Sequence, residues 1–363
     1  MSVNGTNKHN QTAVSRFRLP GMNIPVGPWF GGAAIFCAVL VALLAPLVTN
    51  DYTLTFLLQL FMMLALAQSW NIISGMTGYV SFGHTAFFGI GAYTGALILM
   101  AGLPMIGCFT PENLPWFIAA LSGFAILCGA AMGFLVAFPL GILALRLRGP
   151  YFAIAMLGVN EIGRMVATLW VDVTEGGDGI PLPPSVLPDL SMTYYAMFFL
   201  GAAATGTMAW LHHSRFGLEL KTIREDEGAA EMVGVNTVRD KVLAFLLSAT
   251  IPGAAGVLYV MHTSFIDPSS AFTPILNLQM IVIVLLGGSG TVWGPVLGAV
   301  IIMGFREVMW AEFPAAHLAL LGILVILIVF YMPRGILGLV NRRGAISTND
   351  IPTNCSQTRE PAP

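Results

Sequence analysis

The chain has 363 residues, a formal net charge of −2, and 56% of its residues in the hydrophobic set of Ala, Val, Ile, Leu, Met, Phe, Trp, Tyr and Cys. Only 9% are Asp, Glu, Lys or Arg, whereas the charged share of a soluble domain is about 25%. This composition excludes an ordinary soluble domain and gives no support for nucleic-acid binding. We therefore expect an all-α, polytopic membrane protein with eight to ten transmembrane spans, some of them broken or re-entrant.

Apolar runs long enough to cross a bilayer follow one another along the chain. The polar tail over residues 1–28 is too long and too weakly basic for a typical secretory signal, so we expect the first run to be a retained span. A transmembrane domain over 29–333 and a last polar tail over 334–363 complete the division. The expected spans are roughly 29–48, 53–73, 85–101, 116–140, 150–171, 192–211, 242–262, 275–287, 294–311 and 315–332. Because the eighth run is too short to cross upright, it is expected to be half of a broken helix or part of a re-entrant element.

Lys and Arg residues divide unevenly between the segments that join these spans. If the N-terminus is inside, the inner segments hold fourteen of the sixteen, and only Arg164 and Arg306 lie within spans. The outer segments hold eight acidic residues and no Lys or Arg. Because basic residues near span ends stay on the cytoplasmic side, we expect both tails and the segment 213–241 to be cytoplasmic.

The segment 213–241 is rich in charged residues, whereas most of the chain is apolar. Between Ser214 and Lys241 lie eleven charged residues, in a chain with only 16 Lys and Arg and 18 Asp and Glu. Its middle part, Asp226–Gly234, reads DEGAAEMVG and favours a short helix. The mixed charge suits contact with a hydrated protein surface better than contact with a lipid headgroup layer. A merely solvated loop is the alternative.

Glycines gather in two runs, Ser74–Gly91 and Gly287–Gly298, each with a GxxG step followed by further glycines that enter an apolar run. Small residues in membrane helices allow close packing or mark a break. Broken helices in matching positions indicate a transport path, and the two runs resemble copies of a weak repeat in the same orientation. Two independent packing turns explain the pattern equally well.

Charged residues also occur inside the expected spans. Glu161 and Arg164 are three residues apart, so on a helix they share a face and can pair. A site facing a cavity is one interpretation, but a structural ion pair or an arginine that reaches the inner interface is favoured, because Arg146 and Arg148 lie just before this run. The structural interpretation applies more strongly to Arg306 and its neighbour.

Three uncharged polar residues lie at or before the first glycine run. His84 lies within the run, directly after Phe82 and Gly83, at the mouth of a broken helix. It has the chemistry to bind a ligand or titrate, although a hydrogen-bonded packing role is favoured. Asn71 and Ser69 have side chains suited to a polar substrate, but interhelical hydrogen bonding is the commoner use.

Two outer segments are candidates for contact with an extracytoplasmic partner. Asp172–Pro188 is acidic and rich in Gly and Pro, which predicts an ordered loop rather than a helix. Ser264–Pro274 is expected to be a second outer turn, for which a passive connector is at least as good an explanation.

Motifs for catalysis and metal binding are missing from the sequence. No GxxxxGK[ST] phosphate loop, GxSxG elbow or HExxH helix occurs, so the chain is not expected to hydrolyse ATP or to be an enzyme. The four cysteines, Cys37, Cys108, Cys128 and Cys355, have no metal-ligand spacing and no disulfide pattern. We expect no metal and no cofactor bound by this chain.

Several segments together carry a specific resemblance to a known family, in family order from about residue 55 to 338. They are Asn71–Tyr93 (NIISGMTGYVSFGHTAFFGIGAY), Leu147–Ala155, Gly176–Ile180, Ser214–Gly217, Ile223–Glu227, Ala229, Ala230, Gly234 and Leu285–Gly298. The chain resembles the LivM-type permease subunit of ATP-driven branched-chain amino acid importers. Urea permeases of the same type are close relatives and share much of the pattern.

The resemblance implies a permease that works beside a second, related permease, two cytoplasmic ATPase subunits that use the ATP, and an extracytoplasmic binding protein. It also implies that the charged segment couples the permease to the ATPase, because it looks like the Glu-Ala-Ala…Gly segment of such importers. The implied coupling residues are Arg224, Glu225, Glu227, Ala229, Ala230, Glu231 and Gly234. Gly228 occupies the usual Glu position, so the acidic contact is expected from Glu227, from Glu231 or from neither.

The expected function is import of branched-chain amino acids across the bacterial inner membrane, along a path near the glycine breaks. The binding protein is expected to deliver substrate at the acidic outer face. The residues expected to line the path are Asn71, Gly75, Gly78, Ser81, Gly83, His84, Glu161, Gly287, Gly288 and Gly290. The alternatives are a urea or amide permease of the same family and a secondary transporter acting alone, for which Glu161 is the best ion-coupling carboxylate. An intramembrane enzyme lacks a nucleophile and base set.

Overall fold

The computed structural model describes residues 42–46, 49–106, 113–147, 149–312, 322 and 335–336. The chain divides into two units, Met1–Leu54 and Thr55–Pro363. In the first unit, residues 42–46 are helical and Thr49 Oγ1 donates a hydrogen bond to Ala45 O over 2.7 Å.

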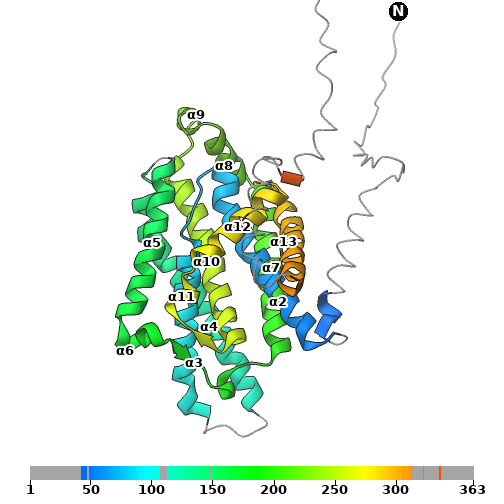
Figure 1. Cartoon of the computed structure of the whole chain (residues 1–363). Coiled ribbons are helices and arrows are strands. Elements are labelled where there is room, and N and C mark those ends of the chain that lie inside the picture. Colours follow the sequence, from blue (N-terminus) through cyan, green and yellow to red (C-terminus); the bar gives the residue numbers. More distant parts are fainter. Residues whose placement is uncertain are drawn as a thin grey trace, which may run out of the picture. The chain divides into compact units, whose positions relative to one another are not determined.

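The described part of the chain is almost entirely helical, as expected (Figure 1). Its elements are α2 (Asp51–Trp70), η1 (Asn71–Gly75), α3 (His84–Ile106), α4 (Leu114–Ala144), α5 (Pro150–Leu169), α6 (Val171–Thr174), η2 (Gly176–Asp178), β1 (Ile180–Pro181), η3 (Pro184–Val186), α7 (Leu190–His213), α8 (Arg215–Glu225), α9 (Glu227–Met232), α10 (Thr237–Thr263), β2 (Phe265–Ile266), α11 (Pro268–Ala271), α12 (Pro274–Gly287) and α13 (Gly294–Glu312).

Six helical segments among the described residues are long and apolar enough to cross a membrane. They are Asp51–Gly75, His84–Met105, Leu114–Ala144, Pro150–Leu169, Thr237–Thr263 and Pro268–Gly287. The polytopic helical fold is therefore confirmed. α7 and α13 are helices at two further expected spans, but these two are not among the six. The expected span 315–332 and most of 29–48 lie outside the described residues.

α10 forms the centre of the packing, against α3 and α4. Glycines bring these helices into backbone contact: a Cβ added to Gly256 would lie 2.1 Å from the carbonyl oxygen of Phe88, and one added to Gly253 would lie 2.4 Å from that of Gly129. Because lipid is as apolar as the side chains, such close packing is what drives helices together in a membrane. Part of the high glycine content is therefore explained by packing rather than by helix breaks.

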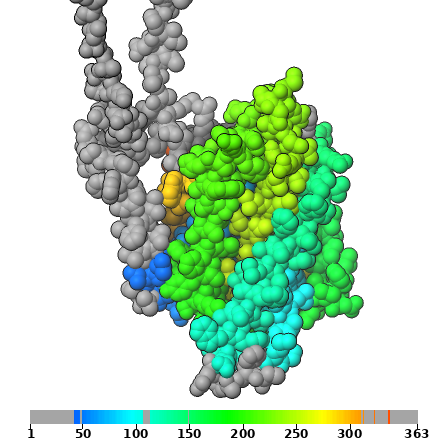
Figure 2. All heavy atoms as spheres, turned by 180° about the vertical axis from the view of Figure 1, so that it is seen from behind, coloured from blue at the N-terminus to red at the C-terminus, as the bar shows by residue number. Residues whose placement is uncertain are grey.

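Different short elements lie at the two ends of the long helices. α8 and α9 lie at one end, and α6 and the β1–β2 pair lie at the other (Figure 1). From behind, the segment around α9 projects beyond its neighbours at the same end (Figure 2). At the opposite end, β1 and β2 pair antiparallel with Ile180 opposite Ile266, so the two outer segments expected from the sequence are joined. The first of them is ordered, as expected, but includes the short helix α6.

Candidate functional site

The charged segment is helical through most of its length rather than a loop containing one short helix. Ser214 Oγ accepts a hydrogen bond from Gly217 N over 3.0 Å and begins α8, and Asp226 Oδ1 accepts one from Ala229 N over 2.9 Å and begins α9. Both are N-cap contacts that satisfy backbone donors left over at a helix start. α10 begins at Thr237, five residues before the expected span, since the Asn236 side chain caps it in the same way.

Gly234 ends α9 in a left-handed conformation. Its φ is +89°, Gly234 N donates to Glu231 O over 3.0 Å, and Val235 N donates to Ala230 O over 3.1 Å. This is the hydrogen-bond pattern of a Schellman cap, which favours glycine because a side chain is strained there. The glycine at this position therefore has a structural reason in addition to any contact with a partner.

α8 and α9 bury one face and expose the other. Leu220, Ile223 and Ala230 are buried in the cluster that includes η1, α3 and α10. At the end of α9, Met232 is 90% exposed and Val233 is 74% exposed. Scattered apolar side chains on a surface are ordinary, but two adjacent ones at the tip of a projecting, charged segment make an apolar contact point that the sequence pattern did not single out.

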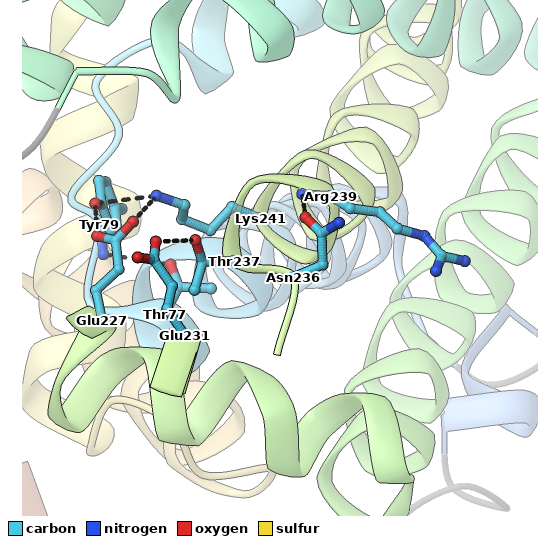
Figure 3. Close-up of polar contacts among 8 residues, drawn as sticks. All are labelled: Thr77, Tyr79, Glu227, Glu231, Asn236, Thr237, Arg239 and Lys241. Atoms are coloured by element: carbon cyan, nitrogen blue, oxygen red, sulfur yellow. Dashed lines mark hydrogen bonds and ion pairs between the residues drawn. The ribbon is translucent and has the colours of Figure 1, made fainter. Parts of the chain in front are cut away.

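Glu227 holds α9 against the rest of the chain (Figure 3). Tyr79 Oη donates to Glu227 Oε2 over 2.5 Å, and Lys241 Nζ donates to Glu227 Oε1 over 2.5 Å and to Tyr79 Oη over 3.2 Å. The side chains of Lys241 and Glu227 are only 1% and 18% exposed. We call Tyr79, Glu227 and Lys241 the α9 anchor. It joins α9 to α10 and to the loop before α3.

Glu231, the other acidic residue expected to contact a partner, also has a bond inside the chain. Thr237 Oγ1 donates to Glu231 Oε1 over 3.0 Å, as Figure 3 shows. Of the two candidates, Glu227 is the more deeply engaged, because it accepts from two side chains and is mostly buried. Glu225 at the end of α8 is exposed.

Both glycine runs interrupt helices, as expected, and the structure brings the two interruptions together. The first follows the π-helical turn η1 and the second follows α12. Asn71 in η1 bridges them: its Oδ1 accepts from Gly290 N over 2.8 Å, and its Nδ2 donates to Thr291 O over 2.9 Å. A Cβ on Gly75 would lie 2.7 Å from Gly290 N, so the two backbones meet closely. We call residues 75–83 and 287–293 the two glycine breaks.

Arg224, at the end of α8, contacts both glycine breaks. Its Nη1 donates to Gly75 O over 2.6 Å, and its Nη2 donates to Ser289 Oγ over 3.4 Å. The first bond satisfies a carbonyl at the end of η1, where regular helical partners run out. An expected coupling residue and the expected path residues are thus in direct contact.

Two further polar residues near the first break, His84 and Ser69, have hydrogen bonds or polar contacts within the chain. His84 is buried with Nδ1 3.1 Å from Ser81 Oγ, and Ser69 Oγ donates to Ser248 O over 2.6 Å. Gly83 faces Met156, and Gly78 has a φ of +79°. At the second break, Gly287 lies against Gly294 O, and Gly288 has a φ of +122°. The hydrogen-bonded packing role favoured for His84 agrees with this arrangement.

Glu161 is the one expected path residue that no described hydrogen bond joins to the breaks. Arg164 Nε donates to both carboxylate oxygens of Glu161 over 3.1 Å, so the expected pairing is present. The two side chains are 48% and 39% exposed on α5. Glu161 lies eleven residues after Pro150, or about 16 Å along the helix, which places this pair near the middle of a bilayer about 30 Å thick.

At the opposite end of the helices, Asp267 fixes the turn between β2 and α11. Its Oδ2 accepts from Ser269 N over 3.1 Å and from Ser270 N over 3.2 Å. Burial by itself would raise the pKa of Asp267, but the hydrogen bonds from Ser269 and Ser270 outweigh it, and the pKa is lowered. Within the described ranges, no three His, Cys, Asp or Glu side chains gather as metal ligands would.

Comparison with known proteins gives a consistent family. The family described as branched-chain amino acid transport system / permease component matches residues 52–329. The LivM permease protein of a high-affinity branched-chain amino acid transport system from Salmonella typhimurium is 30% identical over 297 residues, which cover 74% of this chain and 65% of that protein. The chain thus spans about two thirds of the length of that relative. No solved structure matches.

Two other permeases show how far the likeness extends. LivH from Salmonella typhimurium, of the same kind of transport system, is 26% identical over 316 residues, which cover 80% of this chain and 97% of that protein. LsrC from Salmonella paratyphi B, an autoinducer 2 import system permease protein, is 32% identical over 224 residues, which cover 55% of this chain and 61% of that protein. The family match extends over more than half of the chain, from α2 past the second glycine break. The chain belongs to the family of branched-chain amino acid transport system permease components, as its sequence resemblance predicted.

Proposed function

We propose that this chain is a permease subunit of an ATP-binding-cassette importer for branched-chain amino acids in the bacterial inner membrane. It works without catalysing a reaction itself, beside a second permease, two ATPase subunits that use the ATP, and an extracytoplasmic binding protein. The observation that carries the proposal is the contact of Arg224 with both glycine breaks. This contact gives a projecting charged segment a direct connection to the place where helices are interrupted.

The proposed orientation puts α8, α9 and both tails in the cytoplasm. It rests on the distribution of Lys and Arg, fourteen of which fall on one side. The β1–β2 end then faces outward and receives the binding protein. This assignment agrees with the placement of α9 and the β1–β2 pair at opposite ends of the helices (Figure 1).

The second permease is proposed to cover the exposed face of α5. A charged pair near the bilayer midplane is costly in lipid, and such residues usually face protein or a water-filled cavity. Glu161 and Arg164 are about half exposed in the single chain, and Ile162 and Met165 beside them are exposed apolar side chains. A protein surface with a polar patch would fit this face better than acyl chains.

The ATPase contact is proposed to centre on the tip of α9 and on Glu225. Glu227 and Glu231 already bond within the chain, whereas Met232 and Val233 are open. ATP-driven movement reaches the breaks only if the tip binds one ATPase state better than another, because a ligand without differential affinity shifts no equilibrium. The expected coupling residues Ala229 and Gly234 take part in the two caps of α9, since Ala229 N donates to the Asp226 cap and Gly234 forms the C-terminal cap.

Met232→Asp tests this contact. A charge at the tip is expected to reduce copurification of the ATPase subunits and to lower leucine uptake at least about tenfold, since interface anchors contribute more than about 1–2 kcal/mol each. Leu218→Asp, the same change at an exposed position of α8, is the control. Normal uptake by Met232→Asp at normal membrane levels would contradict the contact. Gly234→Trp is also expected to uncouple, but it strains the α9 cap as well.

The substrate and the energy source have their own tests. Uptake of labelled leucine by the assembled system is expected to continue in excess urea. Loss of uptake would overturn the assignment of branched-chain amino acids as the substrate.

The energy source is tested with the purified chain alone in liposomes. A secondary transporter would move leucine down an ion gradient there, and we expect no such movement. Pairing of Glu161 with Arg164 favours the importer, because it neutralises the best candidate for ion coupling.

A further inference from the structure

A cavity of about 330 Å³ opens among the helices away from α9. Residues of α2, α3, α10, α12 and α13 line it, together with Ser270 and Thr273 beside the outer turn. Its volume lies at the lower end of the range for small-molecule sites, about 300 Å³ and upward. None of the residues expected from the sequence to line a substrate path borders it.

The position of the cavity along the helices follows from residue spacing. Gln59 lies twelve residues before Asn71, and Arg306 lies twelve residues after Gly294. At 1.5 Å per residue, each is about 18 Å from the glycine breaks. In a bilayer core about 30 Å thick, the cavity therefore occupies the half that faces away from α9. In the proposed orientation this is the outer half.

Arg306 is the one permanently charged side chain among the described residues that line the cavity. Its Nη2 donates to Gln59 Oε1 over 3.1 Å. The neighbouring Glu307 attracts its charge, but no salt bridge joins Arg306 to a carboxylate among the described residues. Arg306 lies in the span expected over 294–311, and an arginine inside a membrane span is costly and usually faces a cavity with a function. A guanidinium presents parallel donors that match a carboxylate, so this cavity offers a place for an anionic group.

The rest of the lining is apolar or neutral. Met62, Met63 and Leu276 are buried and border the cavity, and methionine adapts to apolar groups of varied shape. Gln279 adds a neutral amide that both donates and accepts. Among the described residues that line the cavity, none is Asp or Glu. A molecule with one carboxylate and a short apolar side chain meets these conditions, whereas a cation or a strongly polar chain does not.

We propose that this cavity binds the imported α-amino acid on its way through the chain, with the carboxylate on Arg306 and the apolar side chain against Met62, Met63 and Leu276. The inference rests on the proposed function as an amino acid importer and adds the site and the basis of selectivity. Arg306 exchanges its bond with Gln59 for one with the substrate. A neutral, small amide such as urea gains nothing from the guanidinium charge.

The test uses the complete importer and compares Arg306→Gln with Arg306→Lys and with Arg215→Gln, which removes an exposed arginine at the start of α8. We expect Arg306→Gln to raise the KM for leucine uptake at least about tenfold, because charge-assisted hydrogen bonds are the strong ones. ATPase activity stimulated by the binding protein is expected to remain. Arg306→Lys is expected to recover part of the loss, and Arg215→Gln to change KM less than about twofold. An unchanged KM in Arg306→Gln would overturn the proposal.

A labelling experiment covers the case in which Arg306→Gln does not insert. Gln279→Cys places a thiol in the cavity, and the parent chain measures labelling of the natural cysteines. In the Gln279→Cys importer, leucine is expected to slow the reaction of the introduced cysteine with an anionic methanethiosulfonate. Urea is expected to leave that rate unchanged. Equal rates with and without leucine would contradict the site. A parent importer that takes up no leucine would instead remove the proposed function, before any variant is compared.

Discussion

Two acid–base pairs in this chain have the same chemistry but opposite surroundings. In the α9 anchor, Lys241 is buried against Glu227 and Tyr79. On α5, the side chains of Glu161 and Arg164 bond to each other and are about half exposed near the expected bilayer midplane. The first pair is formed within one chain, where it holds α9 against the rest of that chain. The second is only partly covered by its own chain and is suited to assembly. Burial, rather than the presence of an ion pair, separates the two roles.

The largest expected effect comes from Lys241→Met, which removes the buried ammonium group that bonds to the Glu227 carboxylate. Removing one member of a buried pair typically costs about 3–5 kcal/mol, and the residual exposure of Glu227 places this case near the lower figure. We expect a lower midpoint of thermal unfolding in detergent and faster tryptic cleavage near α9. Arg239→Met is the matched control, since Arg239 lies two residues away and points away from the anchor (Figure 3). Equal midpoints for the two variants would refute the anchor.

Tyr79→Phe is expected to have an intermediate effect. It removes the hydroxyl that donates to Glu227 and accepts from Lys241 but keeps the ring. A hydrogen bond to a charged group contributes about 1.5–3 kcal/mol, and the retained ion pair should reduce the loss to about 1–2 kcal/mol. Combining Tyr79→Phe with Lys241→Met should cost less than the sum of the single changes, because the residues share one network. If the stability losses of the two single changes add strictly in unfolding experiments, that result would argue against a shared network.

The smallest effect on the chain alone is expected when both members of the α5 pair are replaced, by Glu161→Gln with Arg164→Gln. An exposed pair contributes little to the stability of the chain that carries it, and removal of both charges leaves none unpaired. The unfolding midpoint should hardly move, whereas copurification of the second permease should fall. A large fall in stability with normal assembly would reverse the comparison between the two pairs.

The fold was predictable from the sequence to the extent that local patterns determine it. Apolar runs of bilayer length indicated the spans, and the glycine runs indicated the helix interruptions, because both signals are contained within about twenty residues. The short helix at α9 was predicted from its composition, and the structure adds the Asp226 cap that begins it. The extent of helix in α8 was underestimated, since the alternating charges concealed the buried positions Leu220 and Ile223.

The contacts of the site were less predictable, because they join distant parts of the chain. Lys241 and Tyr79 are 162 positions apart, and Arg224 and Gly75 are 149 apart. A basic residue in the first turn of α10 has the same sequence appearance whether it is buried, as Lys241 is, or exposed, as Arg239 is. Helical spacing did predict the Glu161–Arg164 pair, for which both partners lie on one helix. The cavity at Arg306 requires five helices and has no signal in any one of them.

In the proposed importer, Arg224 connects the ATPase contact to the glycine breaks. This connection is tested most directly by leucine molecules moved per ATP hydrolysed in the reconstituted importer, comparing Arg224→Ala with Arg215→Ala in the same helix. Because coupling energies are typically about 1–3 kcal/mol, or about 5- to 150-fold, we expect the ratio to fall at least about fivefold in Arg224→Ala. ATPase association should be retained, and the control should keep the parent ratio. An unchanged ratio in Arg224→Ala would contradict the account.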